Sequence, residues 1–294
     1  MVNVYEQIAS NKRRSIIILT GFVGFIAICG YIIGNYTSSP DILPLALILS
    51  LFTSLGGYFA GDKIVLSLNG AKPALRQDHF DFYTVTENLS IATQIPTPKI
   101  YVIKSNAPNA FATGRDPVHA YICATTGLLD KLNRTELEGV IAHELSHIKN
   151  YDIRLMTLVS VLIGSLSILI NMSYNRSFFG KSDNNDNHQS NSVLAIIGFL
   201  LIIFAPIIAQ LIQLAISRQR EFLADAGAVM VTRQPSGLIE ALKKISADSS
   251  RLTQASTATA TLYINNPFKG NKLGSLFSTH PPIAERIAAL EKMM

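Results

Sequence analysis

The hydrophobic residues of this 294-residue chain are concentrated in four blocks that are separated by polar segments. The blocks cover residues 16–34, 42–60, 155–170 and 193–216, and none of them contains Asp, Glu, Lys or Arg. A helix needs about 20 predominantly apolar residues to cross the hydrocarbon core of a bilayer. The pattern therefore predicts four transmembrane helices, the shorter third one being completed if residues 171–174 lie in the interfacial zone. The alternative is that the last two blocks form a buried or re-entrant hairpin.

The polar part of the chain comes in two pieces, and each is small for a domain with a core of its own. We therefore expect the two pieces to fold together. The predicted organisation is a two-span membrane anchor (1–60), a first polar part (61–154), a two-span membrane hairpin (155–216) and a second polar part (217–294).

Within the first polar part, the spacing of apolar residues predicts a helix over residues 79–95. Residues 99–103 read as a strand, and residues 110–113 and 119–124 read as two further short strands. The first polar part is therefore expected to contain a small β-sheet.

A second helix is expected to begin near Thr135, because Thr135 and Glu138 have the spacing of a capping box. In such a box the hydroxyl accepts a backbone N–H, and the carboxylate reaches back to the start of the helix. No helix-breaking residue follows before the third hydrophobic block, so this helix can continue into the membrane.

Basic residues cluster on one side of the predicted membrane. They precede the first block, follow the second, precede the third and follow the fourth, whereas the loop 35–41 has none. By the positive-inside rule, both termini and both polar parts face the cytoplasm. The same charges account for the net charge of +5, so no nucleic-acid partner is needed to explain it. The first block is too long for a signal peptide and is predicted to be a retained anchor.

The helix predicted from Thr135 contains His143, Glu144 and His147. Histidines four residues apart lie on one face of an α-helix, so both imidazoles can bind one metal ion. Zinc lowers the pKa of a bound water to about 7, and Glu144 can then take the proton as the water attacks a peptide carbonyl. The pattern therefore predicts a zinc protease, and the alternative is a pair of histidines on a helix surface.

A third zinc ligand is expected just beyond the fourth block. Glu221 and Asp225 are four residues apart and thus share a helix face. Glu221 is the candidate ligand, and Asp225 would accept a hydrogen bond from a ligand histidine and fix its tautomer. His147 shortly precedes the third block and Glu221 shortly follows the fourth, so a membrane hairpin would bring both ligand helices to one membrane face. The alternative is a solvated acidic helix face.

With these residues, the chain resembles the HtpX family of membrane zinc proteases, which is related to the CAAX-prenyl proteases and to thermolysin-like gluzincins. The resemblance implies a mainly α fold, with four transmembrane helices and a cytoplasmic, zincin-like α+β metalloprotease domain that contains a small β-sheet. Besides the four blocks, the resemblance rests on residues 109–114, 143–147, Glu221, Asp225, 278–282 and Arg286.

The resemblance also implies a function in stress response and protein quality control. A member of this family is expected to cleave misfolded or damaged membrane proteins at the cytoplasmic face of the bacterial inner membrane, with one zinc ion per chain. The implied partners are unfolded or damaged membrane proteins and the lipid bilayer, without nucleic acid. A homo-oligomer is left open.

Two further groups of residues become candidates through the resemblance. An edge strand in the cleft would bind an extended substrate by main-chain hydrogen bonds, the alternative being an ordinary hairpin strand. His280, which precedes two prolines at a helix start, is a candidate for stabilising the oxyanion, the alternative being simple packing. Arg286 is a weaker candidate for the same task or for substrate binding. The candidate edge strand includes Asn109, Ala110, Phe111 and Ala112.

Three other functions compete with this interpretation. An intramembrane protease would carry the histidine motif deep in a hydrophobic block, but here polar residues flank it. A prenyl-protein protease uses the same metal chemistry, with more spans and an enclosed chamber. A non-catalytic metal-binding scaffold would favour four closed protein ligands and would not need Glu144.

Overall fold

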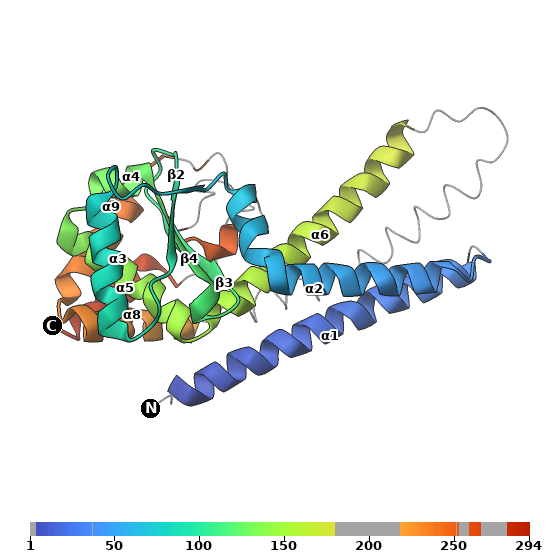
Figure 1. Ribbon diagram of the computed structural model, residues 1–294, viewed down its shortest axis with the longest axis horizontal. Coiled ribbons are helices and arrows are strands. Elements are labelled where there is room, and N and C mark those ends of the chain that lie inside the picture. Colours follow the sequence, from blue (N-terminus) through green and yellow to red (C-terminus); the bar gives the residue numbers. More distant parts are fainter. Residues whose placement is uncertain (1–3, 37, 180–217, 251, 253–258, 266–280) are drawn as a thin grey trace.

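The computed structural model describes residues 4–36, 38–179, 218–250, 252, 259–265 and 281–294. In this part of the chain, three long helices form an arm, and the other elements form a globular unit at one end of it (Figure 1). The helices of the arm are α1 (Val4–Tyr36), α2 (Ile42–Leu68) and α6 (Asp152–Phe179).

Two helices of the arm are long and apolar enough to cross a membrane, over Glu6–Asn35 and Ile42–Leu68. They expose large apolar side chains, such as Phe52 at 77% and Leu45 at 65%, which lipid would cover. These helices correspond to the first two hydrophobic blocks. The third block lies within α6, and the fourth, residues 193–216, lies outside the described residues. The described residues thus support two of the four predicted transmembrane helices.

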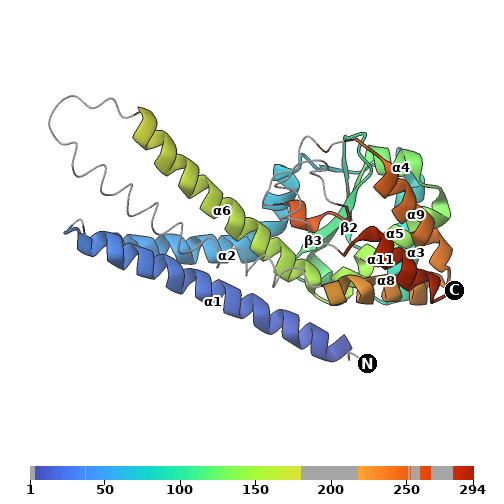
Figure 2. The same ribbon diagram turned by 180° about the vertical axis from the view of Figure 1, so that it is seen from behind.

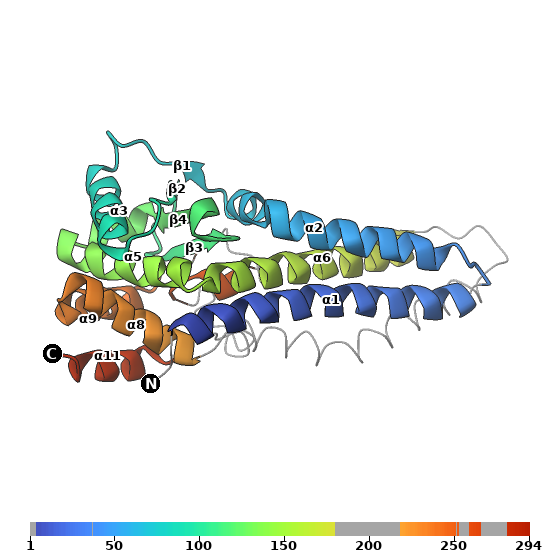
Figure 3. The same ribbon diagram turned by 60° about the horizontal axis from the view of Figure 1, so that its bottom comes forward.

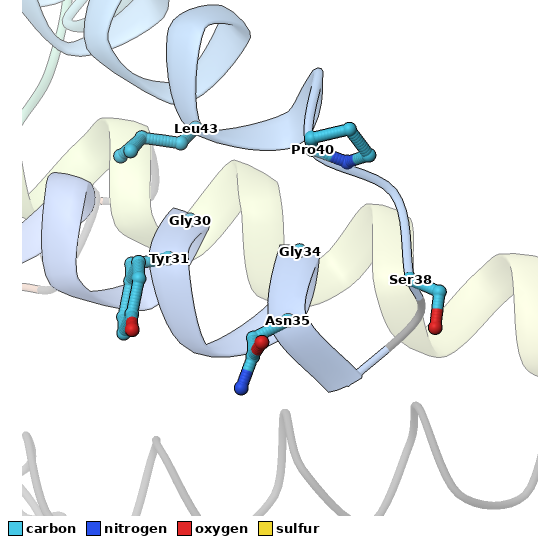
Figure 4. A pocket seen from close by; sticks show the side chains of 7 residues that line it. All are labelled: Gly30, Tyr31, Gly34, Asn35, Ser38, Pro40 and Leu43. Atoms are coloured by element: carbon cyan, nitrogen blue, oxygen red, sulfur yellow. The ribbon is translucent and has the colours of Figure 1, made fainter.

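The turn between α1 and α2 lies at the end of the arm away from the globular unit (Figure 1), and Figure 4 shows it from close by. The two helices approach closely there because Gly30 has no side chain: a Cβ at this position would lie 2.5 Å from the Cβ of Ala46. A hollow of about 380 Å³ opens beside the turn. Among the described residues, its lining contains no acidic, basic or thiol group. The lining residues are Gly30, Tyr31, Gly34, Asn35, Ser38, Pro40 and Leu43.

The globular unit contains a four-stranded sheet with the order β1-β2-β4-β3. Strands β2 and β4 are parallel, with Ile100 opposite Ile122, whereas β3 is antiparallel to β4, with Ala112 opposite Ile122. The predicted bounds are confirmed for β2 and are one residue off for β3 and β4. The strands are β1 (Lys72–Pro73), β2 (Lys99–Ile103), β3 (Ala110–Gly114) and β4 (Ala120–Thr125).

Helix α5 (Arg134–Lys149) lies at the centre of the globular unit. Helix α3 (Phe80–Thr93) and strand β3 pack on one side of it, and α8 (Arg218–Thr232) and α9 (Pro235–Ala247) pack on the other. Helix α11 (Ile283–Glu291) covers α8 and α9, as Figures 2 and 3 show. The fold is mainly helical with a small mixed sheet, as predicted. Shorter elements are α4 (Thr126–Lys131) and two 3-10 turns, Pro117–His119 and Ala260–Leu262.

Both ends of α5 differ from the prediction. The capping box is formed by Asn133 and Glu136: Asn133 Oδ1 accepts from the backbone N–H of Glu136, and Glu136 Oε2 accepts from that of Asn133. Thr135 already lies inside the helix, so the predicted box with Glu138 is wrong. The helix also does not continue into the membrane, because Tyr151 adopts φ +61° and separates it from α6.

Close packing of α5 on α9 depends on Gly139. A Cβ at this position would lie 2.6 Å from the backbone nitrogen of Leu238 and 2.8 Å from its Cα. The Gly139→Ala substitution should therefore destabilise the protein by about 1–3 kcal/mol, the usual cost of overpacking. Thermal unfolding in detergent measures the change. Gly56→Ala is the matched control, because a Cβ at Gly56 would meet nothing within 4 Å, and equal melting temperatures for the two variants would contradict this packing.

Candidate metal centre

Three side chains that can bind a metal ion converge between α5 and α8. His143 and His147 come from one face of α5, and Glu221 comes from the first turn of α8. The Nε2 atoms of the two histidines are 3.2 Å apart. Glu221 Oε2 lies 3.7 Å from Nε2 of His143, and Glu221 Oε1 lies 3.5 Å from Nε2 of His147. All three residues are buried. The structure therefore brings together the three ligands proposed from the sequence, within 4.8 Å of one another.

The outer nitrogens of both histidines face carboxylates. His143 Nδ1 lies 2.9 Å from Oδ1 of Asp225, and His147 Nδ1 lies 2.9 Å from Oδ2 of Asp152. A carboxylate accepts, so in the neutral form of each imidazole Nδ1 carries the proton and Nε2 presents a lone pair, as metal binding requires. Two lone pairs that face each other at 3.2 Å repel unless a cation lies between them. The donor arrangement therefore fits a metal ion.

Asp152 was not identified as part of the site from the sequence. It lies five residues after His147, a spacing that would place it on another face of a continuous helix. The left-handed residue Tyr151 breaks the helix and turns the Asp152 carboxylate back toward His147. Helical periodicity could not reveal this contact, although an acidic residue at the predicted start of a membrane span was a signal worth following.

Burial and nearby charges give the two histidines different proton affinities. Burial, assisted by the positive charge of Arg286, lowers the pKa of His143 to about 4. Burial also disfavours the charged form of His147, but the hydrogen bond to Asp152 and the charge of Glu221 outweigh it and raise its pKa to about 9. Without a metal ion, His147 therefore carries a second proton at neutral pH, on the Nε2 atom that faces Nε2 of His143.

Arg286 lies against the metal-site carboxylates and is completely buried. Its Nε and Nη2 atoms donate to the two oxygens of Asp225 at 2.9 and 2.6 Å, and Nη1 lies 3.5 Å from Glu221. Arg286 therefore forms a bidentate pair with Asp225, a partner that the sequence did not suggest. His280, the other oxyanion candidate, lies outside the described residues.

The candidate substrate strand β3 is an edge strand, as expected, but all five of its residues are buried. The side chain of Asn109 donates to the carbonyl of Asn265, and the Phe111 ring packs against Tyr263 at 5.0 Å between centroids. These two side chains therefore hold the segment 259–265 in place. The expectation that this edge strand binds an extended substrate stays a prediction.

The comparisons with known proteins agree with this centre. A family model described as peptidase family M48 matches residues 78–294. The chain belongs to peptidase family M48. A protease HtpX homolog of Dictyoglomus turgidum is 43% identical over 291 residues, which are 98% of this chain and 94% of the relative. One of Streptococcus gordonii is 39% identical over 296 residues, which cover 99% and 100% of the two chains. The resemblance to HtpX is confirmed.

Among solved structures, this M48 peptidase is similar to the crystal structure of S. mikatae Ste24p. The TM-score is 0.53 at 20% sequence identity, and the match covers 98% of this chain and 67% of that one. The similarity concerns the fold. The family, the relatives named protease HtpX homolog and the two apolar helices support a membrane metallopeptidase.

Zinc, on which M48 peptidases depend, fits the donor set of this chain. His143 and His147 would contribute Nε2, and Glu221 would contribute a carboxylate oxygen. Two histidines and one carboxylate leave a fourth position for water, which is the composition of hydrolytic zinc sites.

The proton on His147 makes zinc binding depend on pH. Zinc needs the neutral imidazole, so below a pKa of about 9 each zinc ion that binds must displace one proton from His147. Zinc affinity should rise about tenfold per pH unit between pH 6 and 8.5 and level off above about pH 9. Competition with a chelator of known affinity measures this slope. In Asp152→Asn the plateau should begin at lower pH, and a wild-type affinity that is independent of pH would contradict the assignment.

Proposed function

We propose that this M48 peptidase is a zinc endopeptidase of the cytoplasmic membrane face that cleaves misfolded or damaged membrane proteins. One observation carries the proposal: the buried ligand set adjoins the membrane arm directly. His147 lies two residues from the end of α5, and Asp152, which contacts its Nδ1, is the first residue of α6. A site so close to the arm favours substrates held at the bilayer surface, and the basic residues flanking the spans favour the cytoplasmic side.

Glu144 is the proposed general base. A zinc ion bound by His143, His147 and Glu221 would supply Lewis acidity and lower the pKa of a water molecule. Glu144 lies next to His143 in the same buried turn of α5 and is 3% exposed. Its carboxylate accepts a proton from the attacking water and then passes it to the nitrogen of the leaving amine, so that the peptide C–N bond breaks without a free amide anion.

Strand β3 is the proposed docking site for the substrate main chain. The carbonyl of Asn109 accepts a hydrogen bond from the backbone N–H of Thr125 in β4. In an antiparallel pair, every second residue directs its N–H and C=O groups to the partner strand, so those of Ala110, Ala112 and Gly114 point away from β4. The Ala110 carbonyl already accepts from Ile264, and the Gly114 N–H donates to Thr157. Ala112 is the remaining outward residue. Because it is 3% exposed, the edge must be uncovered before a substrate strand can pair there.

The experiment uses the purified full-length chain in lipid nanodiscs, with measured zinc content. It is offered a soluble unfolded polypeptide, a destabilised multi-span membrane protein and a prenylated peptide. The zinc-loaded protein should cleave the first two, a chelator should stop cleavage and added zinc should restore it. Cuts in the membrane protein should map to its cytoplasmic loops.

Other outcomes would replace the proposal. Cleavage restricted to the prenylated peptide would indicate a prenyl-protein protease, and cuts within transmembrane segments would indicate an intramembrane protease. A fully zinc-occupied protein that cleaves none of the three would indicate a metal-binding scaffold.

A further inference from the structure

The two oxygens of Asp152 have different partners. Oδ2 accepts from Nδ1 of the ligand histidine His147 at 2.9 Å. Oδ1 accepts from the side-chain amide of Asn11 at 2.7 Å. Asn11 belongs to α1, 141 residues away in the sequence, and is completely buried. A chain of hydrogen bonds therefore runs from the first helix of the membrane arm to a proposed zinc ligand.

Asn11 contacts both sides of the joint between α5 and α6. Its Nδ2 atom also donates to the backbone carbonyl of Asn150, the residue after α5, at 2.9 Å. Next to it, Lys12 Nζ lies 4.3 Å from the ring centroid of the left-handed residue Tyr151. Figure 3 shows the N-terminal part of α1 beside α8, on the side of α5 that carries the metal centre. The start of α1 thus holds the break that turns Asp152 toward His147.

Among the described contacts of Asp152 Oδ1, the hydrogen bond from the side-chain amide of Asn11 is the shortest. Arg220 Nη1 lies 3.8 Å from the same oxygen, beyond hydrogen-bond distance. Because both oxygens of Asp152 are held by hydrogen bonds, the carboxylate fixes the orientation of the His147 imidazole. Groups that orient a metal ligand in this way influence metal affinity. Loss of the amide would leave one oxygen of a buried carboxylate without its nearest donor.

We propose that Asn11 is a positioning residue of the metal centre, acting on His147 through Asp152. The inference rests on the zinc site proposed above and goes beyond it. Asn11 lies outside the matched family region 78–294 and within the helix that the sequence suggested only as an anchor. On this proposal, α1 both spans the membrane and helps to orient a ligand of the zinc site.

The test compares zinc affinity, by chelator competition, and the visible spectrum of the cobalt-substituted protein for the full chain in nanodiscs. Asn11→Leu should bind zinc about tenfold more weakly and change the cobalt spectrum, because the geometry at His147 changes. Ile18→Ala is the matched control: Ile18 is also buried in α1 and belongs to an apolar cluster that contains Leu155 and Val159 of α6. It should leave affinity and spectrum unchanged, even where it lowers the melting temperature.

A double-mutant cycle shows whether Asn11 acts through Asp152. In the Asp152→Asn background, Asn11→Leu should cause no further loss of zinc affinity. If Asn11→Leu does not fold, Asn11→Asp takes its place, since it keeps the shape but puts a second carboxylate against Asp152. Wild-type affinity and spectrum in the Asn11 variant, equal losses in the Ile18 control, or additive losses in the cycle would overturn the inference. A wild-type protein that binds no zinc would overturn the metal centre itself, and this inference with it.

Discussion

The Glu144→Gln variant is expected to lose proteolytic activity by a factor on the order of 10³ while it keeps its zinc, because a general base of this kind typically contributes 10²–10⁴-fold. Glutamine has the same shape but cannot accept the proton of the attacking water. Glu144 is separate from the three residues that could hold the metal, so zinc content should not change. The measurement is kcat on an unfolded polypeptide, with zinc content determined on the same samples.

Glu138→Gln is the matched control for this variant. Glu138 lies on the same helix but near the surface, where it pairs with Arg134 at 3.4 Å. The same change of charge on α5 should leave kcat within experimental error, because surface ion pairs contribute little. If Glu144→Gln remained as active as the wild type at full zinc occupancy, Glu144 would not be the base. If it lost zinc together with activity, its main task would lie in holding the metal site.

The metal ligands could be proposed from the sequence because two independent regularities point to them. The spacing of four placed His143 and His147 on one helix face, and the hydrophobic blocks placed Glu221 near the same end of the membrane hairpin. Both rules are local, since each depends on a period or a length within one segment. The same periodicity led to the proposal that Asp225 contacts a ligand histidine, and in the structure that histidine is His143.

Other features of the site depend on events that local rules do not describe. Asp152 reaches His147 only because Tyr151 leaves the helical conformation, and Asn11 reaches Asp152 only because α1 folds back beside the joint. The capping box was misplaced because two overlapping pairs, Asn133–Glu136 and Thr135–Glu138, have the same spacing. Only the tertiary position of the helix start decides between them. The covered state of β3 likewise depends on a segment about 150 residues further along the chain.

A second large effect is expected for Arg286→Met. Arg286 is completely buried, and its guanidinium binds both oxygens of Asp225 and lies 3.5 Å from Glu221. Removing it takes the bidentate cation from the buried carboxylate of Asp225, and breaking a buried pair in this way costs about 3–5 kcal/mol. For a protein of this size the melting temperature should fall by roughly 10 °C. Zinc should recover part of the loss, because its charge compensates Glu221.

Two further variants separate this structural role from the role in substrate or oxyanion binding that the sequence suggested. Arg76→Met removes an exposed Arg–Glu pair, whose side chains are 54% and 34% exposed, and should change the melting temperature little. Asp225→Asn combined with Arg286→Met should cost less than the sum of the single changes, because the double variant leaves no charge at position 225. A structural role thus predicts a large loss of stability. If the Arg286→Met variant had the melting temperature of the wild type but a lower kcat, Arg286 would instead bind the substrate or stabilise the oxyanion. The buried pair with Asp225 would then have to open during catalysis.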